Sequence, residues 1–547
     1  MNPIEIRQLS SLTKVFCDRI VGEDCRAETA LGGQEVAFQL AYRLVTEKFS
    51  HDVFSLETDS PLSDCVTLYR VGDLISEYPA HLYRYDEDYL TRTPGAFPDP
   101  LYPIVAEERL LADTGLWRAV WISVRVPAGF PAGEYPVILR LVSAGECVAT
   151  VTYTVKVLAF DLPAQKLKHT QWFHCDCIAD VHGVPVFSEE HWALMEKYVR
   201  MAAEHGINVL LTPVLTPPLD TEIGGERPTV QLVQIEKSGE AYTFDFSRLE
   251  RYAAMAERCG IRYLEINHLF SQWGAFAAPK VVATVDGEER QIFGWETPAA
   301  GEAYKAFLEA LIPQLIAALE RMGFGRERLL FHISDEPKDE QTESYRAALA
   351  IVSPLLEGYT VIDALSNYRY YEEDLVRHPV VSLDHLEPFL AHRIEGLWCY
   401  YCCSQCEKVP NRFWAMPSRR NRILGVLLYR YHMDGFLQWG FNFYYSHHSL
   451  KKLDPYRCTD AERAFQSGDA FVVYPYGDDV IPSLTLKVFA EGLADLRMLE
   501  LLEQKQGRAA TEALLDRLYG KTMTFTDYPR EDAFFVRLYE EAEKLLG

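Results

Sequence analysis

Between residues 168 and 444 the sequence alternates eight times between a short apolar run and a longer helical or loop segment. Each run has the length of a strand and is rich in Val, Ile, Leu or aromatic residues. The runs lie at 168–176, 207–213, 261–269, 328–334, 360–365, 380–383, 397–402 and 435–444. Eight such alternations within about 280 residues favour a (β/α)8 TIM-like barrel over an open sheet.

The segments between these runs predict helices and two insertions. Helices are expected at 189–204, 249–258 and 299–322. The insertions at 229–246 and 280–295 follow the second and third predicted strands, and each has the pattern of a hairpin. Because both follow the carboxyl end of a strand, we expect them to build a substrate cleft.

Residues 1–163 have a different pattern from the barrel. After a short helical start, β-branched runs at 116–126, 135–142 and 148–160 are separated by Pro and Gly turns. This pattern predicts an N-terminal antiparallel β-sandwich that ends at Leu162-Pro163-Ala164. The predicted domains are therefore a β-sandwich at 1–163, a catalytic barrel at 164–450 and a C-terminal helical extension at 451–547, whose helices at 484–503 and 531–546 cover the barrel.

Composition excludes several functions. A formal net charge of −25 speaks against a nucleic-acid partner, since binding would release no phosphate counterions. No secretory signal and no apolar run long enough to cross a membrane is visible. The twelve cysteines lie mostly within apolar runs, which is typical of reduced thiols and predicts a cytoplasmic location. The pattern does not reveal whether the chain forms an oligomer.

One cysteine cluster has the spacing of a metal motif. Cys399, Cys402, Cys403 and Cys406 form a C-x2-C-C-x2-C pattern. However, residues 398–402 read as a buried strand, and no distant Cys/His pair has zinc-site spacing. We therefore favour a packing role for this cluster and expect no metal and no other cofactor.

Two adjacent acids end the fourth predicted strand. Asp335 and Glu336 follow the apolar run 329–333, and Pro337 cannot continue the ladder. Neighbouring strand side chains point to opposite faces, so two consecutive acids converge only where the strand has ended. Barrel enzymes keep their chemistry at that end. The sequence thus predicts a catalytic pair; the alternative is that both acids cap the next helix.

Other polar and aromatic residues lie at or just after the predicted strand ends. The candidate substrate-binding residues are His174, Asp176, Asn267, His268, Trp273, Asp363, Trp398, Tyr400, Tyr401, Trp439 and Asn442. Aromatic faces with carboxylates, amides and imidazoles suit a sugar ring, whose C–H faces stack and whose hydroxyls accept and donate hydrogen bonds. Each residue also has a structural alternative: an aromatic in the barrel core, a buried histidine, or a helix cap for Asp363 and Asp384.

Several of these motifs together resemble glycoside hydrolase family 123 and, more closely, the related group known as domain of unknown function 4091. The resemblance is carried by 332–337 (HISDEP), 439–442 (WGFN), 97–101 (FPDPL) and the late residues Tyr474-Pro475, Ser483-Leu484 and 491–495 (EGLAD). It extends over nearly the whole chain, and the Asp-Glu pair is its specific part. This sequence departs from the family at Thr485 or Lys487, where members often carry Arg.

The resemblance implies a β-sandwich followed by a (β/α)8 barrel, and hydrolysis of terminal β-linked N-acetylgalactosamine, or N-acetylhexosamine more broadly, from a small glycan or glycoconjugate. It also implies a retaining, substrate-assisted route through an oxazolinium intermediate. Glu336 would then be the general acid and base, while Asp335 would orient the acetamido group. Such close carboxylates push their pKa values apart. From their positions on the predicted strands, and not from the resemblance, we expect Tyr400 or Tyr401 to donate to the acetamido oxygen and Trp439 to form the floor under the ring.

Two other functions stay open from the sequence. The first is a glycosidase for a sugar without an acetamido group, with a carboxylate such as Asp363 or Asp384 as nucleophile. The second is a non-catalytic glycan-binding protein, because a fold does not fix a function. The intact Asp335-Glu336 pair argues against the second.

Overall fold

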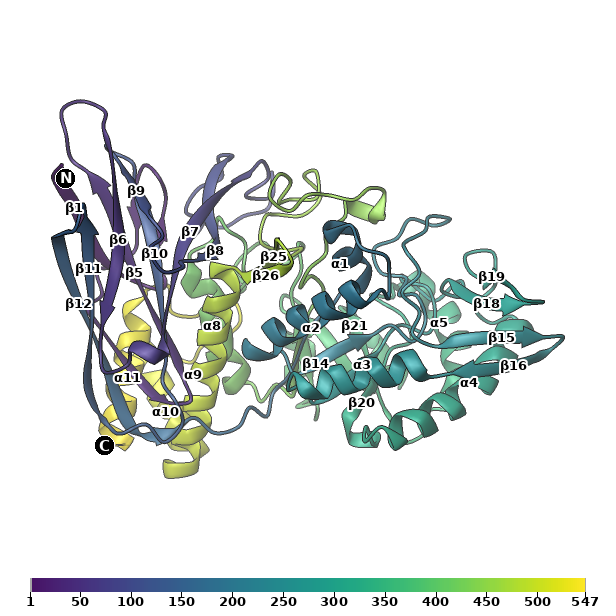
Figure 1. Ribbon diagram of the computed structural model, residues 1–547. Coiled ribbons are helices and arrows are strands. Elements are labelled where there is room, and N and C mark those ends of the chain that lie inside the picture. The colour runs from purple at the N-terminus through teal and green to yellow at the C-terminus, as the bar shows by residue number, and fades with distance from the viewer. Residues whose placement is uncertain (1, 547) are drawn as a thin grey trace.

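The N-terminal part of the computed structural model, which describes residues 2–546, consists of two five-stranded sheets (Figure 1). In sheet order, the first contains β1 (Ile4–Ser10), β5 (Glu35–Leu44), β10 (Arg118–Arg125), β7 (Val66–Ser76) and β8 (Gly95–Pro103). The second contains β4 (Ala27–Gly32), β12 (Glu146–Asp161), β11 (Gly133–Ser143), β6 (His51–Asp59) and β9 (Leu110–Asp113). Apolar residues of both sheets share one core, in which the rings of Phe38 and Tyr153 lie 4.5 Å apart. The chain opens with strand β1, so the predicted helical start is wrong.

The predicted barrel is confirmed. Eight parallel strands close on one another: β13 (Lys168–Gln171), β14 (Val209–Thr212), β17 (Tyr263–Ile266), β20 (Leu329–Phe331), β21 (Thr360–Leu365), β22 (His378–Ser382), β23 (Trp398–Tyr400) and β24 (Gly435–Gln438). Several strands are shorter than their apolar runs, because the chain stays buried after it leaves the barrel wall. Asp176, for example, belongs to helix α1 (Cys175–His182) and not to the first strand.

Helices follow the barrel strands as expected. They are α2 (Glu189–Glu204), α3 (Ser247–Arg258), α4 (Glu302–Arg321), α5 (Thr342–Val352), α6 (Arg369–Glu372), α7 (Glu387–Ala391) and α8 (Ser418–Arg430). Helix α2 has the predicted bounds for local reasons. Ser188 caps it by accepting a hydrogen bond from the backbone N–H of His191. It ends before Gly206, whose φ of 82° lies in the left-handed region that glycine tolerates.

The two insertions form hairpins, but these do not build the cleft. Strands β15 (Gln234–Ser238), β16 (Ala241–Asp245), β18 (Val281–Val285) and β19 (Glu288–Phe293) join into one four-stranded sheet. Phe244 and Phe293 of this sheet pack on Phe307 of α4, with ring centroids 6.0 and 5.2 Å away. The sheet lies at the end of the molecule far from the N-terminal strands (Figure 1). None of the residues described in either hairpin lines the cavity at the carboxyl ends of the barrel strands, so the expectation that the hairpins build a substrate cleft there is wrong.

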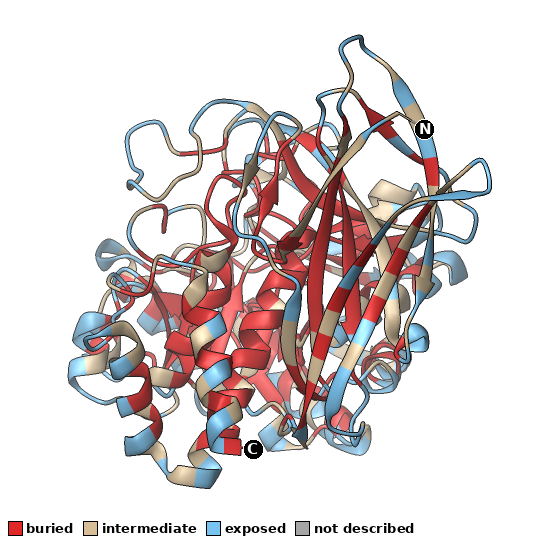
Figure 2. Cartoon of the chain, turned by 90° about the vertical axis from the view of Figure 1, so that its left-hand side faces the viewer, coloured by how far each residue is buried: buried red, intermediate tan, exposed pale blue. Residues whose placement is uncertain are grey.

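The C-terminal helices lie between the barrel and the N-terminal sheets (Figures 1 and 2). They are α9 (Leu484–Gln506), α10 (Arg508–Tyr519) and α11 (Ala533–Leu546). Helix α9 packs closely on α8, because a Cβ added to Gly425 would lie 1.8 Å from the carbonyl oxygen of Gly492. Arg422 adds a bidentate ion pair to Asp495, at 2.8 and 3.0 Å. Among residues 2–546 no helix is both long and apolar enough to cross a membrane.

The late sequence motif connects the parts of the chain. Asp99 on β8 is fully buried and accepts hydrogen bonds from the backbone N–H and the hydroxyl of Thr485, at 3.2 and 2.6 Å. The hydroxyl of Tyr474 donates to the same carboxylate. Glu491 accepts from Ser11 at 2.9 Å and from Arg422 at 3.1 Å. These motif residues therefore join the N-terminal sheet to the barrel and α9.

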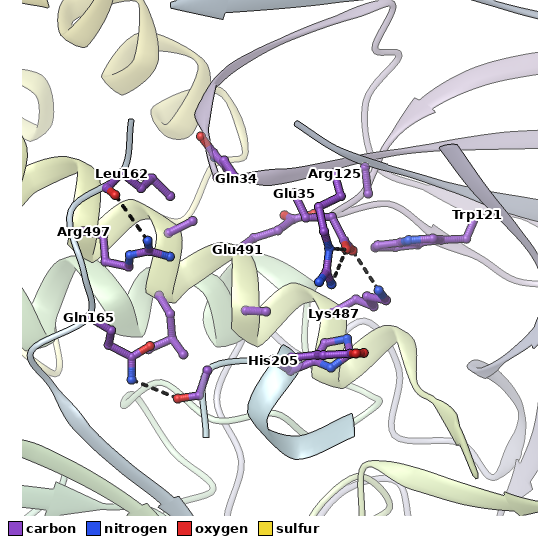
Figure 3. A pocket seen from close by; sticks show the side chains of 17 residues that line it. Gln34, Glu35, Trp121, Arg125, Leu162, Gln165, His205, Lys487, Glu491 and Arg497 are labelled. Carbon is purple, nitrogen blue, oxygen red and sulfur yellow. Dashed lines mark hydrogen bonds and ion pairs between the residues drawn. The ribbon is translucent and has the colours of Figure 1, made fainter. Parts of the chain in front are cut away.

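A polar cavity of about 130 Å³ lies at this junction (Figure 3). Three of its charged side chains, Glu35, Arg125 and Lys487, are paired with one another. Lys487 Nζ lies 2.7 Å from Glu35 Oε1, and Arg125 Nη2 lies 3.0 Å from Glu35 Oε2. The Lys487 side chain is only 5% exposed. The cavity is therefore bordered by a buried ion pair between β5 and α9.

We expect Lys487→Met to destabilise the fold by about 3 kcal/mol, because it leaves Glu35 with one of its two cationic partners. Burial raises the pKa of Glu35, but Lys487, His205 and Arg125 outweigh it and hold the pKa well below the ordinary 4.5. The stabilisation is thus present above pH 4.5 and is lost as the pH falls. Urea unfolding at pH 7 and at pH 4 measures the free energy of unfolding of both proteins. The difference between Lys487→Met and the wild type should be smaller at pH 4. The control Lys521→Met removes an exposed pair and should cost under about 1 kcal/mol.

Candidate active site

A cavity of about 210 Å³ lies at the carboxyl ends of the barrel strands. Its acidic residues are Asp220, Asp335 and Glu336. Aromatic rings form much of its wall, from Trp172, Trp273, Tyr400, Trp439, Phe443 and Phe465. Polar contacts also come from His174, Gln272 and His447. This composition suits a ligand that has both hydroxyl groups and an apolar ring face.

Asp335 and Glu336 lie in the segment that follows strand β20. Both are half-buried and line this cavity. Their backbone is fixed on both sides: Trp273 N–H donates to the carbonyl oxygen of Asp335 at 2.9 Å, and Glu336 N–H donates to that of Ala364 at 3.1 Å. Glu336 has a φ of 40°, a strained left-handed conformation of the kind found at functional sites. The next helical turn begins at Asp339 with Lys338 as its N-cap, so neither acid is that cap.

The pKa values of both acids are raised. Burial raises the pKa of Asp335 well above its ordinary value, and the nearby carboxylates of Glu336, Asp363 and Asp220 raise it further. Burial also raises the pKa of Glu336, which a hydrogen bond from the Tyr400 hydroxyl partly offsets. Two acids this close titrate as one unit that holds a single proton between its two steps. Burial therefore keeps a proton on the pair at a higher pH than on an exposed carboxyl group.

A buried network lies beneath the pair. His332 Nε2 lies 2.7 Å from Glu265 and its Nδ1 3.1 Å from Asp363, and all three side chains are fully buried. Asp363 also accepts a hydrogen bond from the backbone N–H of Ile333 at 3.0 Å. Although burial alone lowers the pKa of His332, the hydrogen bonds to Asp363 and Glu265 raise it to about 9. An imidazolium between two carboxylates thus holds the segment that leads into Asp335.

We expect His332→Gln to cost about 3–5 kcal/mol, because two buried carboxylates lose their cationic partner. The pKa of His332 is raised by folding, so its contribution is complete below pH 6.5 and is lost as the pH rises through about 9. Urea midpoints between pH 6 and pH 10 should therefore fall in the wild type and fall less in His332→Gln. His385→Gln, at a half-exposed histidine, is the control and should leave the wild-type profile unchanged.

Trp439 is held by a separate set of contacts. Its indole N–H donates to Asp469 at 3.1 Å, and Asp469 also accepts from the side chain of Gln438 at 3.0 Å. The Trp439 ring meets Phe443 and Phe465 edge to face, at 5.0 and 4.9 Å. A half-buried tryptophan that is fixed in this way offers a preformed surface to a sugar ring.

The model of the glycoside hydrolase 123 catalytic domain matches residues 172–502, which is more than half of the chain. The chain belongs to glycoside hydrolase family 123. It is therefore a glycosidase that acts on a glycan, and its matched region includes the acidic pair and the aromatic wall described above.

A solved structure of a family 123 enzyme has the same fold over the whole chain. A family 123 glycoside hydrolase from Clostridium perfringens, studied for glycolipid glycan hydrolysis, has a TM-score of 0.73 at 14% identity, covering 100% of this chain and 97% of that one. A Bacteroides ovatus GH5 xyloglucanase has a TM-score of 0.31 at 9% identity, covering 90% and 100% of the two chains. A Bacteroides vulgatus putative glycoside hydrolase also has 0.31, at 12% identity, covering 87% and 78%. No curated protein matches the chain significantly.

In this family 123 protein the structure brings six of the predicted site residues together around the cavity. They are Asp335, Glu336, His174, Trp273, Tyr400 and Trp439. His174 is held rigidly, since one ring nitrogen lies 3.0 Å from the carbonyl oxygen of Trp439 and the other accepts from Arg227 at 3.2 Å. Burial and the charge of Arg227 lower the pKa of His174 to about 3, so its imidazole is neutral.

The other seven predicted residues do not line the cavity: Asp176, Asn267, His268, Asp363, Trp398, Tyr401 and Asn442. Asp176 forms a buried ion pair with Arg227, at 2.7 and 2.8 Å. Asn442 bridges the backbone N–H and carbonyl oxygen of His174, at 2.9 and 3.0 Å. These two residues support cavity residues from behind, which is a structural role.

The remaining five pack inside the protein. His268 stacks on His332 with ring centroids 4.3 Å apart. Asn267 accepts from the backbone N–H of Leu215 at 3.1 Å. Trp398 fills the space beside Gly435, where a Cβ would lie 2.1 Å from the indole. Tyr401 is fully buried against Phe436, and Asp363 belongs to the His332 network.

The site also contains residues outside the predicted set. Asp220 and His447 come from loops after β14 and β24, and Phe443 and Phe465 complete the aromatic wall. Cys402 and Cys403 line the cavity, while Cys399 and Cys406 are buried. Asp220 lies in an irregular loop with no motif, so only its position after the second strand pointed to this face. His447 and His448 are adjacent histidines that follow the eighth strand, and this pattern could have identified His447 as a site residue.

Proposed function

We propose that this family 123 protein is a retaining exo-glycosidase that removes terminal β-linked N-acetylgalactosamine, or N-acetylhexosamine more broadly, by substrate-assisted catalysis. The observation that carries the proposal is the half-buried Asp335-Glu336 pair, with both pKa values raised, in an aromatic cavity at the end of the barrel. General acid catalysis near neutral pH needs a carboxyl group whose pKa is raised in this way.

In the first step, the acetamido oxygen of the substrate attacks C1 while the bond from C1 to the leaving oxygen breaks. Glu336 gives its proton to that oxygen, and a cyclic oxazolinium ion forms. In the second step, water attacks C1 and gives a proton to Glu336, and the ring opens to restore the acetamide. No bond to the enzyme forms, because the internal nucleophile has a high effective concentration.

Asp335 would accept a hydrogen bond from the acetamido N–H and stabilise the positive charge that develops there. That hydrogen bond favours the ionised form of Asp335. We therefore infer that substrate binding moves the shared proton of the pair to Glu336, where the reaction needs it. Tyr400, the one of the two candidate tyrosines that lines the cavity, already donates to Glu336. Trp439 would form the floor under the ring.

The competing glycosidase with an enzymic nucleophile has weaker support. Asp363 is fully buried and bonded to His332, Tyr345 and backbone N–H groups. Asp384 binds Gln405 and His385 and does not line the cavity. Among the cavity residues that the structure describes, Asp220 is the only carboxylate besides the pair.

A panel of aryl β-glycosides tests the proposal on the purified full-length protein: N-acetylgalactosaminide, N-acetylglucosaminide and galactoside. The acetamido substrates should be hydrolysed at least about 100-fold faster than the galactoside, because the galactoside lacks the internal nucleophile. Faster hydrolysis of the galactoside, or a trapped glycosyl ester on the protein, would instead establish an enzymic nucleophile.

The cytoplasmic location is a prediction from the cysteine pattern.

A further inference from the structure

Three side chains with metal-binding atoms meet at the rim of the cavity, outside the acidic pair. Asp220 comes from the loop after β14, and His447 and His448 come from the loop after β24. One potential ligand atom of each lies within 4.8 Å of the others. Asp220 Oδ1 and His447 Nε2 are 3.8 Å apart, which is too long for a hydrogen bond but close to the separation of two ligands on one ion.

The two loops that carry these residues are fixed to each other. The backbone N–H of His448 donates to Asp220 Oδ2 at 3.0 Å, and Ser449 Oγ donates to the carbonyl oxygen of Asp220 at 2.6 Å. The backbone N–H of Glu222 donates to the carbonyl oxygen of His448 at 3.0 Å. The donor atoms are therefore held in place by contacts that do not use Asp220 Oδ1 or either imidazole.

The donor atoms of the cluster have unused capacity. His448 Nδ1 is buried and has no hydrogen-bond partner among the residues that the structure describes. A buried polar atom without a partner costs free energy, which a ligand bound to that atom would offset. Asp220 is 14% exposed and His447 is 48% exposed, and both line the cavity. An ion between them is reachable from solvent.

We propose that Asp220, His447 and His448 bind a divalent transition-metal ion of the zinc class at the mouth of the cavity. Two imidazoles and one carboxylate are a set that zinc accepts, whereas calcium and magnesium prefer oxygen ligands alone. Three protein ligands leave coordination positions open. Because two of the ligands line the cavity, a hydroxyl or an anionic group of a bound glycan can occupy an open position. The site stands independently of the proposed hexosaminidase activity.

Metal titration of the full-length, tag-free protein after chelator treatment tests this site. Calorimetry with Zn²⁺ and the visible absorption of bound Co²⁺ both report binding without an activity assay. The wild type should bind one equivalent of each ion. Asp220→Asn, His447→Asn and His448→Asn should each weaken binding by at least about 10-fold. The matched control His432→Asn, at an exposed histidine before β24 at the opposite end of the barrel, should bind as the wild type does.

His447→Asn is the decisive variant, because His447 is exposed and none of the hydrogen bonds that fix the two loops uses its side chain. Urea midpoints for all variants show whether a loss of binding comes from a loss of fold. The proposal is overturned if the wild type binds neither ion below millimolar concentration. It is also overturned if folded His447→Asn binds Zn²⁺ with unchanged affinity, since the three groups are then only a polar cluster on the rim.

Discussion

Glu336→Gln is expected to lower kcat for a glycoside with a poor leaving group by about 10²–10⁴-fold, because the amide cannot protonate the departing oxygen. An aryl glycoside with an acidic phenol as leaving group needs no protonation, so its first step should be nearly unaffected. The oxazolinium intermediate should then be consumed slowly, since the amide side chain of this variant cannot activate water. Steady-state rates on alkyl and nitrophenyl substrates measure the difference.

Azide distinguishes the loss of the general base Glu336 from damage to the structure. It attacks C1 without needing a general base, so it should speed up the Glu336→Gln variant on the nitrophenyl substrate and yield a glycosyl azide of retained configuration. Glu340→Gln, at an exposed carboxylate four residues further along, in the helical turn that begins at Asp339, is the control and should match the wild type. If Glu336→Gln hydrolyses the alkyl glycoside as fast as the wild type does, Glu336 is not the general acid.

Asp335→Asn is expected to lower kcat by about 10²–10³-fold on both types of leaving group. The carboxylate stabilises positive charge on the acetamido nitrogen, and a neutral amide cannot. The loss therefore does not depend on the leaving group, which distinguishes Asp335 from Glu336. Asp286→Asn, at the exposed tip of the β18–β19 hairpin with a φ of 53°, is the matched control.

Fluorinated acetamido substrates test the same residue from the substrate side. Each fluorine weakens the carbonyl oxygen as a nucleophile, so wild-type kcat should fall steeply from acetamido to trifluoroacetamido. A flat dependence would mean that the acetamido oxygen takes no part, and the role of Asp335 would have to be revised. Far-UV circular dichroism on both variants keeps unfolding apart from lost chemistry.

The sequence predicted the barrel well because its strands are short, buried on both faces and separated by helical segments. Helix α2 shows why: Ser188 and Gly206 fix its two ends locally. The acidic pair was predicted from the apolar run that leads into Asp335, Glu336 and Pro337, although strand β20 itself already ends at Phe331. Local chemistry determined these features, so a single sequence was enough to find them.

The other site residues could not be predicted reliably, because a sequence does not show how deeply a side chain lies below the cavity. His268 follows β17 and Asp363 lies within β21, yet neither lines the cavity, because both are fully buried against His332. Tyr400 and Tyr401 are neighbours, but only Tyr400, the last residue of β23, lines the cavity, whereas Tyr401 is buried against Phe436. Asp220 was missed because its place depends on hydrogen bonds to a loop more than 200 residues away.

The position of α9 has a consequence for biosynthesis. Phe97, Leu101 and Trp121 of the N-terminal sheets share one hydrophobic cluster with the barrel and with Leu486 and Leu493 of α9. The sheets leave the ribosome first, but α9 is among the last segments to emerge. The apolar face that α9 covers is therefore exposed to solvent until the whole barrel has been synthesised. Nascent chains stalled before Leu484 should bind chaperones, and fragments cut there should aggregate.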